Sequence, residues 1–117
     1  TSVFSQMAAI AALEGPQDSV GMMMEEFTKR RDLVVAGLNS LPGITCPEPK
    51  GAFYAFPNIK GTGLSSKEFA EKAMYEAGVA LLAGTAFGSF GDGYIRISFA
   101  NSQDNLREAI HRLETIL

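Results

Sequence analysis

One arginine near the C-terminal end of the chain is the side chain best suited to chemistry. Arg96 lies in the middle of residues 94–100, whose alternating apolar residues predict a β-strand. Because successive side chains of a strand point to opposite faces, Arg96 and Ser98 share one face. The other face carries Ile95, Ile97 and Phe99. A guanidinium is permanently charged, and its planar fork of donors matches a carboxylate. We therefore interpret Arg96 as a carboxylate-binding residue; a surface arginine paired with a nearby acid is the alternative.

The segment directly before this strand is rich in glycine. Residues 84–93 include four glycines. Phosphate-binding glycine motifs of the dinucleotide type follow a strand and open a helix, whereas this segment runs into a strand, so that function is excluded. We expect instead a mobile rim beside Arg96, with Phe87 and Phe90 as its apolar elements. A plain irregular connection is the alternative.

Other residue types that could be reactive give weaker signals. Lys67 follows two serines, as Schiff-base lysines often do, but Ser65 and Glu68 form a capping box. Lys67 then lies in an exposed first turn, without the desolvating pocket that would activate it. Cys46 and His111 are the only cysteine and histidine, and they fall on a predicted loop and a predicted surface helix. We expect neither a catalytic residue nor a metal site within the chain.

The composition is that of one globular domain. The chain has 117 residues, of which 46% are hydrophobic and 20% are charged. A net charge of −3 gives no electrostatic reason to expect nucleic acid or an anionic membrane as partner. No apolar stretch approaches the roughly 20 residues that span a bilayer, and the first residues lack the pattern of a signal peptide. The lone Cys46 cannot form an internal disulfide, which favours a reducing, cytoplasmic location.

The hydrophobic periodicity predicts an α+β fold. Helices are expected at residues 3–13 and 16–40, and Leu41-Pro42-Gly43 ends the second. Strands are expected at residues 51–57, 79–82 and 94–100, with further helices after the caps Ser65 and Asn101 or Ser102. These elements predict a small mixed three-stranded sheet with helices packed on one face, preceded by a long interdomain helix.

The second helix is longer than the remaining chain requires. Helices of globular proteins average about 11–12 residues, so this one is expected to bridge to something absent. Its apolar stripe, spaced by three and four, comprises Val20, Met23, Met24, Phe27, Val34, Leu38 and Leu41. We interpret the run Met22–Met24 as adaptable core filler rather than as a groove for a partner.

Several segments together resemble the C-terminal part of class I/II aminotransferases, in the branch that includes bacterial aspartate aminotransferases. The matching segments are Ser5-Gln6, Ala11-Ala12-Leu13, Arg30-Arg31-Asp32-Leu33-Val34, Leu41-Pro42-Gly43, residues 49–57, Gly84 with Phe87-Gly88, and residues 93–100. Their order and spacing carry the resemblance, which extends over the whole chain. One departure is Ala83, because relatives commonly have proline before the glycine that corresponds to Gly84.

This resemblance implies roles for particular residues. In that family the arginine of the Arg-Ile-Ser segment binds the α-carboxylate of the amino-acid substrate, a role that falls on Arg96. Phe53, Tyr54 and Phe87 would line the substrate channel. Residues 1–14 would form a helix packed on a missing large domain. Residues 15–117 would form the small domain that closes over the substrate in a homodimer.

The resemblance also implies pyridoxal phosphate as cofactor of the complete protein, with an amino acid and a 2-oxo acid as substrates. The missing large domain would hold the cofactor and the Schiff-base lysine, so the isolated 117 residues should be inactive. Related lyases and synthases share this fold, which leaves the reaction class open. The alternative function is a stand-alone, non-catalytic module that binds carboxylates through Arg96 or mediates an interaction.

Overall fold

The computed structural model describes residues 1–117 and contains four helices, three short strands and three 3-10 turns. The helices are α1 (Val3–Glu14), α2 (Asp18–Ser40), α3 (Ser66–Tyr75) and α4 (Gln103–Glu114). The strands are β1 (Tyr54–Ala55), β2 (Leu82–Ala83) and β3 (Ile95–Ser98). The 3-10 turns are η1 (Lys60–Thr62), η2 (Gly84–Phe87) and η3 (Ser89–Gly91). The predicted α+β class and three-stranded sheet are confirmed. None of the helices is long and apolar enough to cross a membrane.

The sheet is antiparallel throughout, with β3 between β1 and β2. Tyr54 is opposite Ser98, and Leu82 is opposite Arg96. The expectation of a mixed sheet is therefore wrong. The crossover through α3 leaves β1 and β2 running the same way, but β3 lies between them, so no neighbouring strands are parallel.

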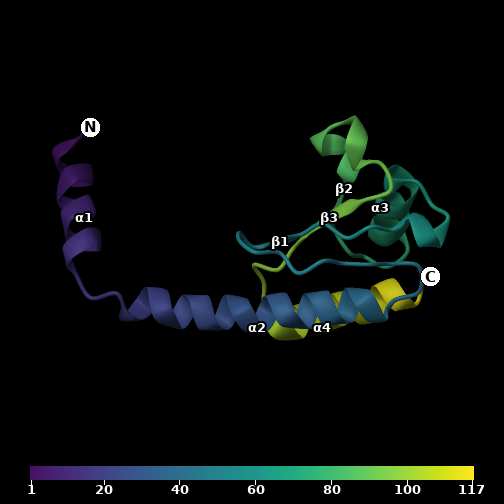
Figure 1. Ribbon diagram of the computed structural model, residues 1–117, viewed down its shortest axis with the longest axis horizontal. Coiled ribbons are helices and arrows are strands. Elements are labelled where there is room, and N and C mark those ends of the chain that lie inside the picture. Colours follow the sequence, from purple (N-terminus) through teal and green to yellow (C-terminus); the bar gives the residue numbers. More distant parts are fainter.

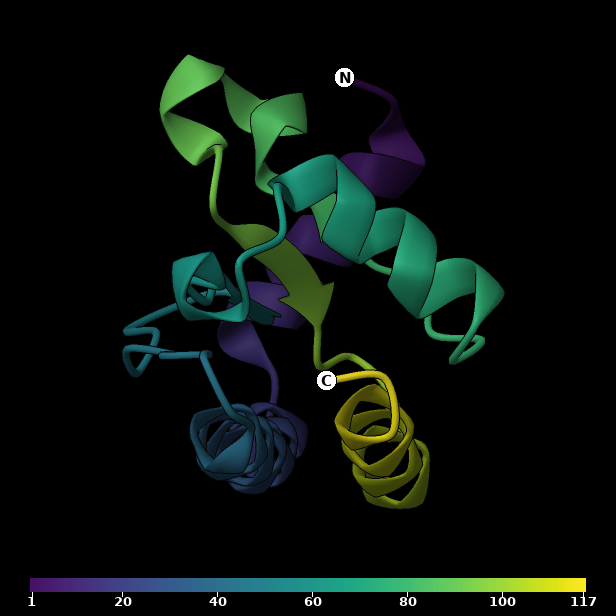
Figure 2. The same cartoon turned by 90° about the vertical axis from the view of Figure 1, so that its right-hand side faces the viewer.

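The C-terminal half of α2 and the whole of α4 lie side by side beneath the sheet (Figure 2). They approach closely at Gly37, where an added Cβ would lie 2.9 Å from the side chain of Ile110. Helix α3 contacts the edge strand β2 and contributes Phe69 and Ala73 to the same core. The sheet adds Ala55, Ile95 and Ile97 to this core. One hydrophobic core thus holds the three helices and the sheet together.

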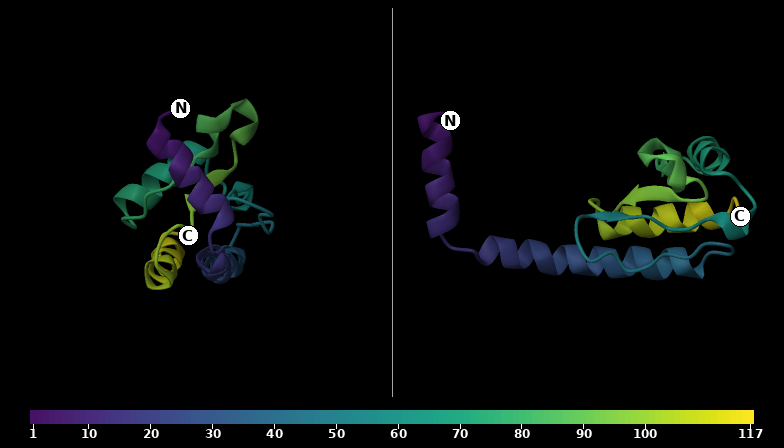
Figure 3. Two further views of the ribbon diagram at one scale, coloured as in Figure 1. Left: turned by 90° about the vertical axis from the view of Figure 1, so that its left-hand side faces the viewer. Right: turned by 45° about the horizontal axis from the view of Figure 1, so that its top comes forward.

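Helix α1 and the first turns of α2 project far from this core (Figures 1 and 3). The radius of gyration is 17.3 Å, whereas a compact chain of this length would have about 13 Å. No residue of α1 is buried. The run Met22–Met24 is also exposed, so its interpretation as core filler is wrong within this chain. The physical reason is that the rest of the chain packs on α2 from Glu26 and Phe27 onward and leaves the preceding turns largely uncovered.

The strands are shorter than the sequence predicts. Residues 51–57 form only a two-residue strand. Ala52 has a left-handed φ of 57°, which interrupts the extended backbone, and Pro57 has no N–H to donate. The strand expected at residues 79–82 is reduced to Leu82–Ala83, because the N–H of Val79 bonds back to the carbonyl of Ala73 at the end of α3.

Helices α3 and α4 start at their predicted caps, whereas α2 begins at Asp18, two residues later than expected. Ser65 and Glu68 form the reciprocal bonds of a capping box at the start of α3. These hydrogen bonds from the Ser65 hydroxyl and backbone hold the pKa of Glu68 below its usual range. Ser102, rather than Asn101, caps α4 by accepting from the N–H of Asn105.

A buried serine anchors the glycine-rich segment to α3. The Ser66 hydroxyl donates to the carbonyl of Gly91 at 3.1 Å and accepts from the N–H of Tyr94 at 3.1 Å. Replacing Ser66 by alanine leaves both backbone groups without this partner. We expect the free energy of unfolding to fall by about 1–3 kcal/mol, measured by urea denaturation.

The matched control is Ser89→Ala, which changes an exposed serine in the same segment. Its expected effect is within about 0.5 kcal/mol. Equal stability of the Ser66→Ala and Ser89→Ala variants would show that Ser66 is not an anchor.

Candidate functional site

Arg96 is presented by the central strand on the face that points away from the core. Ile95 and Ile97 are 0% and 4% exposed, whereas Arg96 is half-buried and Ser98 is exposed. The predicted division of this strand into two faces is confirmed. Strand β3 is hydrogen-bonded on both sides, so the backbone of Arg96 is fixed by its neighbours rather than by a loop.

Two aromatic rings cover the guanidinium of Arg96. Its Cζ lies 4.3 Å from the ring centroid of Tyr54 and 4.2 Å from that of Phe87. Tyr54 comes from β1, next to β3, and Phe87 comes from the end of η2. Both distances lie well within the roughly 6 Å over which a cation is attracted to an aromatic face. The structure therefore brings together three of the residues that the sequence singles out.

A second pair of rings extends this aromatic cluster. Phe56 stacks on Tyr94 with centroids 5.5 Å apart, and it meets Phe87 edge-on at 6.1 Å. Neither Phe56 nor Tyr94 was identified from the sequence as part of a site. Strand alternation would have revealed Phe56, because it lies two residues after Tyr54 on the same face.

No acid of the chain neutralises Arg96. The seven ion pairs of the chain all involve other residues. No polar side-chain atom is both buried and without a partner, so the unpaired donors of this guanidinium reach solvent. The alternative of an arginine paired with a nearby acid is therefore wrong within this chain. The arrangement leaves a cation whose donors are free to bind an anion.

The segment that carries Phe87 is tightly folded rather than loose. Residues 84–91 form the 3-10 turns η2 and η3, and the N–H of Gly84 donates to the carbonyl of Tyr94 at 2.8 Å. The backbones of Gly84 and Gly91 are so close that a Cβ on either would overlap the carbonyl oxygen of the other. The expected rim thus consists of two successive turns closed by a glycine–glycine contact, so the alternative of a plain irregular connection is wrong, whereas the mobility of the rim stays a prediction.

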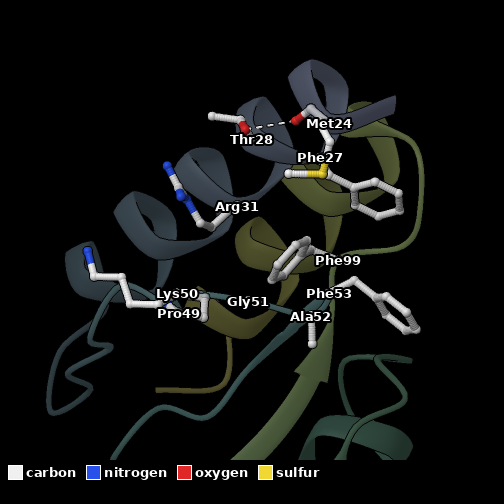
Figure 4. Close-up of a pocket in the computed structure, with 10 residues that line it drawn as sticks. All are labelled: Met24, Phe27, Thr28, Arg31, Pro49, Lys50, Gly51, Ala52, Phe53 and Phe99. Atoms are coloured by element: carbon white, nitrogen blue, oxygen red, sulfur yellow. Dashed lines mark hydrogen bonds between the residues drawn. The ribbon is translucent and has the colours of Figure 1, made fainter. Parts of the chain in front are cut away.

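A separate groove of about 280 Å³ lies between α2 and residues 49–53 (Figure 4). Phe27, Phe53 and Phe99 form its apolar wall. Arg31 and Lys50 stand at its polar side, and both pair with Glu48. The hydrogen bond from Lys50, followed by the charges of Lys50 and Arg31, holds the pKa of Glu48 below its usual range.

Phe53 belongs to this groove rather than to the arginine site. The centroid of its ring lies 6.2 Å from that of Phe27 and 4.5 Å from that of Tyr54. It therefore lies next to the arginine site through Tyr54, and it has no cation–ring contact with Arg96. In the sequence, only the opposite orientation of neighbouring side chains on a strand distinguishes Phe53 from Tyr54.

The remaining reactive side chains do not assemble into a site. No group of three or more His, Cys, Asp or Glu side chains could hold a metal ion. Burial raises the pKa of the Cys46 thiol. His111 is exposed on the last turn of α4, and its Nδ1 atom lies 3.7 Å from Oε2 of Glu114.

The comparisons with known proteins all point to one family. The family model described as "Aminotransferase class I and II" matches residues 1–113. An aspartate aminotransferase of Pyrococcus horikoshii is 48% identical over 116 residues, covering 97% of this chain and 30% of the relative. An aromatic-amino-acid aminotransferase of Thermococcus litoralis is also 48% identical over 116 residues, with the same coverage of 97% and 30%.

Solved structures have the same fold over nearly the whole chain. The aromatic aminotransferase of Pyrococcus horikoshii superposes with a TM-score of 0.91 and 46% identity, covering 96% of this chain and 30% of that one. The aspartate aminotransferase of Rhizobium meliloti superposes with a TM-score of 0.87 and 39% identity, covering 95% of this chain and 30% of that one. This chain therefore spans about 30% of the length of the curated relatives it matches.

The contact between Gly84 and Gly91 yields a prediction about the site. A Gly91→Ala substitution forces the two backbones apart and moves the turn that carries Phe87. We expect the free energy of unfolding to fall by about 1–3 kcal/mol in urea denaturation.

The control is Gly51→Ala, since nothing lies within 4 Å of the added Cβ at that position. Its effect should stay within about 0.5 kcal/mol. A Gly91→Ala variant as stable as the unsubstituted chain would contradict the close contact.

Proposed function

The chain belongs to the class I and II aminotransferase family, and from this we propose that it is the substrate-closing small domain of a longer aminotransferase. The complete protein would move an amino group between an amino acid and a 2-oxo acid. The relatives' names include aspartate, aromatic-amino-acid and LL-diaminopimelate aminotransferases. Because those names differ in the amino acid, we propose only the class of substrate and no particular amino acid.

The observation that carries this proposal is the free cation of Arg96. An amino acid and a 2-oxo acid share an α-carboxylate, so one guanidinium can bind both substrates of the reaction. A bidentate arginine–carboxylate contact fixes the orientation of the substrate as well as its position. In this role Arg96 binds and orients, and Tyr54, Phe87 and the neighbouring Phe53 line the approach to it.

The lysines of the chain are not placed to hold pyridoxal phosphate, the cofactor that the family implies. Lys72 donates to the carbonyl of Ile116 at 2.6 Å, and Lys60 lies over the ring of Tyr94. Lys50 and Lys67 are exposed in surface ion pairs, and Lys29 is exposed on α2. We infer that the cofactor and its lysine belong to a part of the protein outside this chain. The isolated chain would then be inactive.

The projecting helices support a two-part organisation. Residues 1–14 would pack on the large domain, and residues 15–117 would form the small domain with α2 as the connecting helix. The exposed apolar residues of α1, including Phe4 at 88% and Leu13 at 82%, support this assignment. We further propose that the complete protein is a cytoplasmic homodimer. The free Cys46 is compatible with a reducing compartment.

The role of Arg96 is tested by substitution in the complete protein. Arg96→Ala removes a charge-assisted contact worth about 1.5–3 kcal/mol, so kcat/KM for the amino acid should fall by about 10- to 150-fold. Arg96→Lys should recover little, because an ammonium is a point charge without the planar fork.

The control is Arg107→Ala, which removes an exposed arginine on α4 whose hydrogen-bond partner, Gln103, lies on the same helix. Steady-state kinetics should show no more than a twofold change, because surface substitutions have small effects, within about 0.5 kcal/mol. An unchanged kcat/KM in Arg96→Ala would rule out the assignment.

A further inference from the structure

We propose that Tyr54 and Phe87 are positioning residues that hold the Arg96 guanidinium between their rings and leave only its edge open to a carboxylate. This inference rests on the proposed function and adds a mechanism by which the arginine is oriented. With both rings in place, a ligand would have to bind in the plane of the guanidinium.

The geometry places a ring against the guanidinium carbon from two separate elements. The Cζ atom of Arg96 is 4.3 Å from the centroid of Tyr54 and 4.2 Å from that of Phe87. Rings at these distances attract the cation and restrict rotation of the long side chain about its bonds. The rings accept no hydrogen bond from the N–H groups of the guanidinium. All five donors therefore remain available along the edge of the planar group.

Because Arg96 has no acid partner, the two rings restrain its guanidinium in place of an ion pair. None of the ion pairs of the chain includes Arg96. An unrestrained arginine loses rotamer freedom when it binds a ligand, which weakens binding. Because the rings impose this order before the ligand arrives, the cost of ordering the arginine at the moment of binding is reduced.

The two rings differ in how firmly they are held. Tyr54 is fixed on β1 by its register with Ser98. Phe87 is 49% exposed and stands on the 3-10 turns, where the ring of Phe56 meets it edge-on. The position of this turn therefore sets whether the ring of Phe87 covers the guanidinium. The anchor from Ser66 to Gly91 holds that turn against α3.

The test uses the complete protein with variants that remove a ring face and variants that keep it. Tyr54→Leu and Phe87→Leu remove the faces, whereas Tyr54→Phe and Phe87→Tyr retain them. Two readouts are measured for each variant. Calorimetry gives the dissociation constant of succinate, a simple dicarboxylate, and steady-state kinetics with L-aspartate, L-alanine and L-phenylalanine gives KM and kcat.

Each leucine variant is expected to raise the succinate dissociation constant and the amino-acid KM by about 2- to 30-fold, the range that one cation–π contact supports. kcat should change less than KM, because the rings act before chemistry. The ring-retaining variants should stay within about twofold of the unsubstituted protein, since the aromatic face persists. Bound-cofactor absorbance checks that each variant is folded.

A double-substitution cycle separates positioning from general damage. In an Arg96→Ala background, Phe87→Leu should change the succinate dissociation constant by less than about twofold, because the residue acts only through the arginine. The matched control is Tyr75→Leu, which removes an 85% exposed ring at the end of α3, outside the glycine-rich segment. It should leave both readouts unchanged.

The inference is overturned if the leucine variants bind succinate as well as the unsubstituted protein. It is also overturned if Phe87→Leu weakens binding equally in the Arg96→Ala background, or if Tyr75→Leu has the same effect as Phe87→Leu. Failure of the proposed function looks different: no amino group would be transferred from any of the three amino acids. Succinate binding would then still report on the rings.

Discussion

The position of β3 between two antiparallel neighbours is the constraint on which the site depends. Its register with β1 and β2 buries Ile95 and Ile97 and turns Arg96 to the opposite face. A slip of one residue would bury the guanidinium and expose both isoleucines. Burying an unpaired charge costs several kcal/mol or more, and exposing two isoleucines adds to this, so the alternative register is strongly disfavoured. The direction of Arg96 therefore follows from burial of the core.

Helix α2 passes through two environments, and the difference explains the shape of the molecule. Its C-terminal half buries Val34 and Leu38 against the core, whereas Met22 and Met23 near its start are 66% and 55% exposed. Helix α1 continues this exposed apolar surface. A chain that exposes so many large apolar residues over two helices has surface suited to burial against another polypeptide.

The sequence predicted those parts of the fold that depend on local chemistry. Helix boundaries followed from the Ser65 capping box and the break at Leu41-Pro42-Gly43, and the two faces of β3 followed from alternation. The strand lengths were not predictable, because they depend on the left-handed Ala52 and on the turn that ends α3. The burial of the methionines was mispredicted, since periodicity shows which face is apolar but not whether anything covers it.

The same limit applies to the arginine site. Residue type and spacing single out Arg96 and Phe87, and the family resemblance adds Tyr54, but the contact between them depends on pairing β1 with β3 and on the closed turns at Gly84 and Gly91. This contact stabilises the cation and at the same time keeps its donors available to a ligand. A carboxylate partner would stabilise Arg96 but would occupy the donors that the proposed substrate needs. Aromatic faces attract the cation through their π-electrons and leave those donors free. A half-buried arginine without an acid is therefore stable and still able to bind.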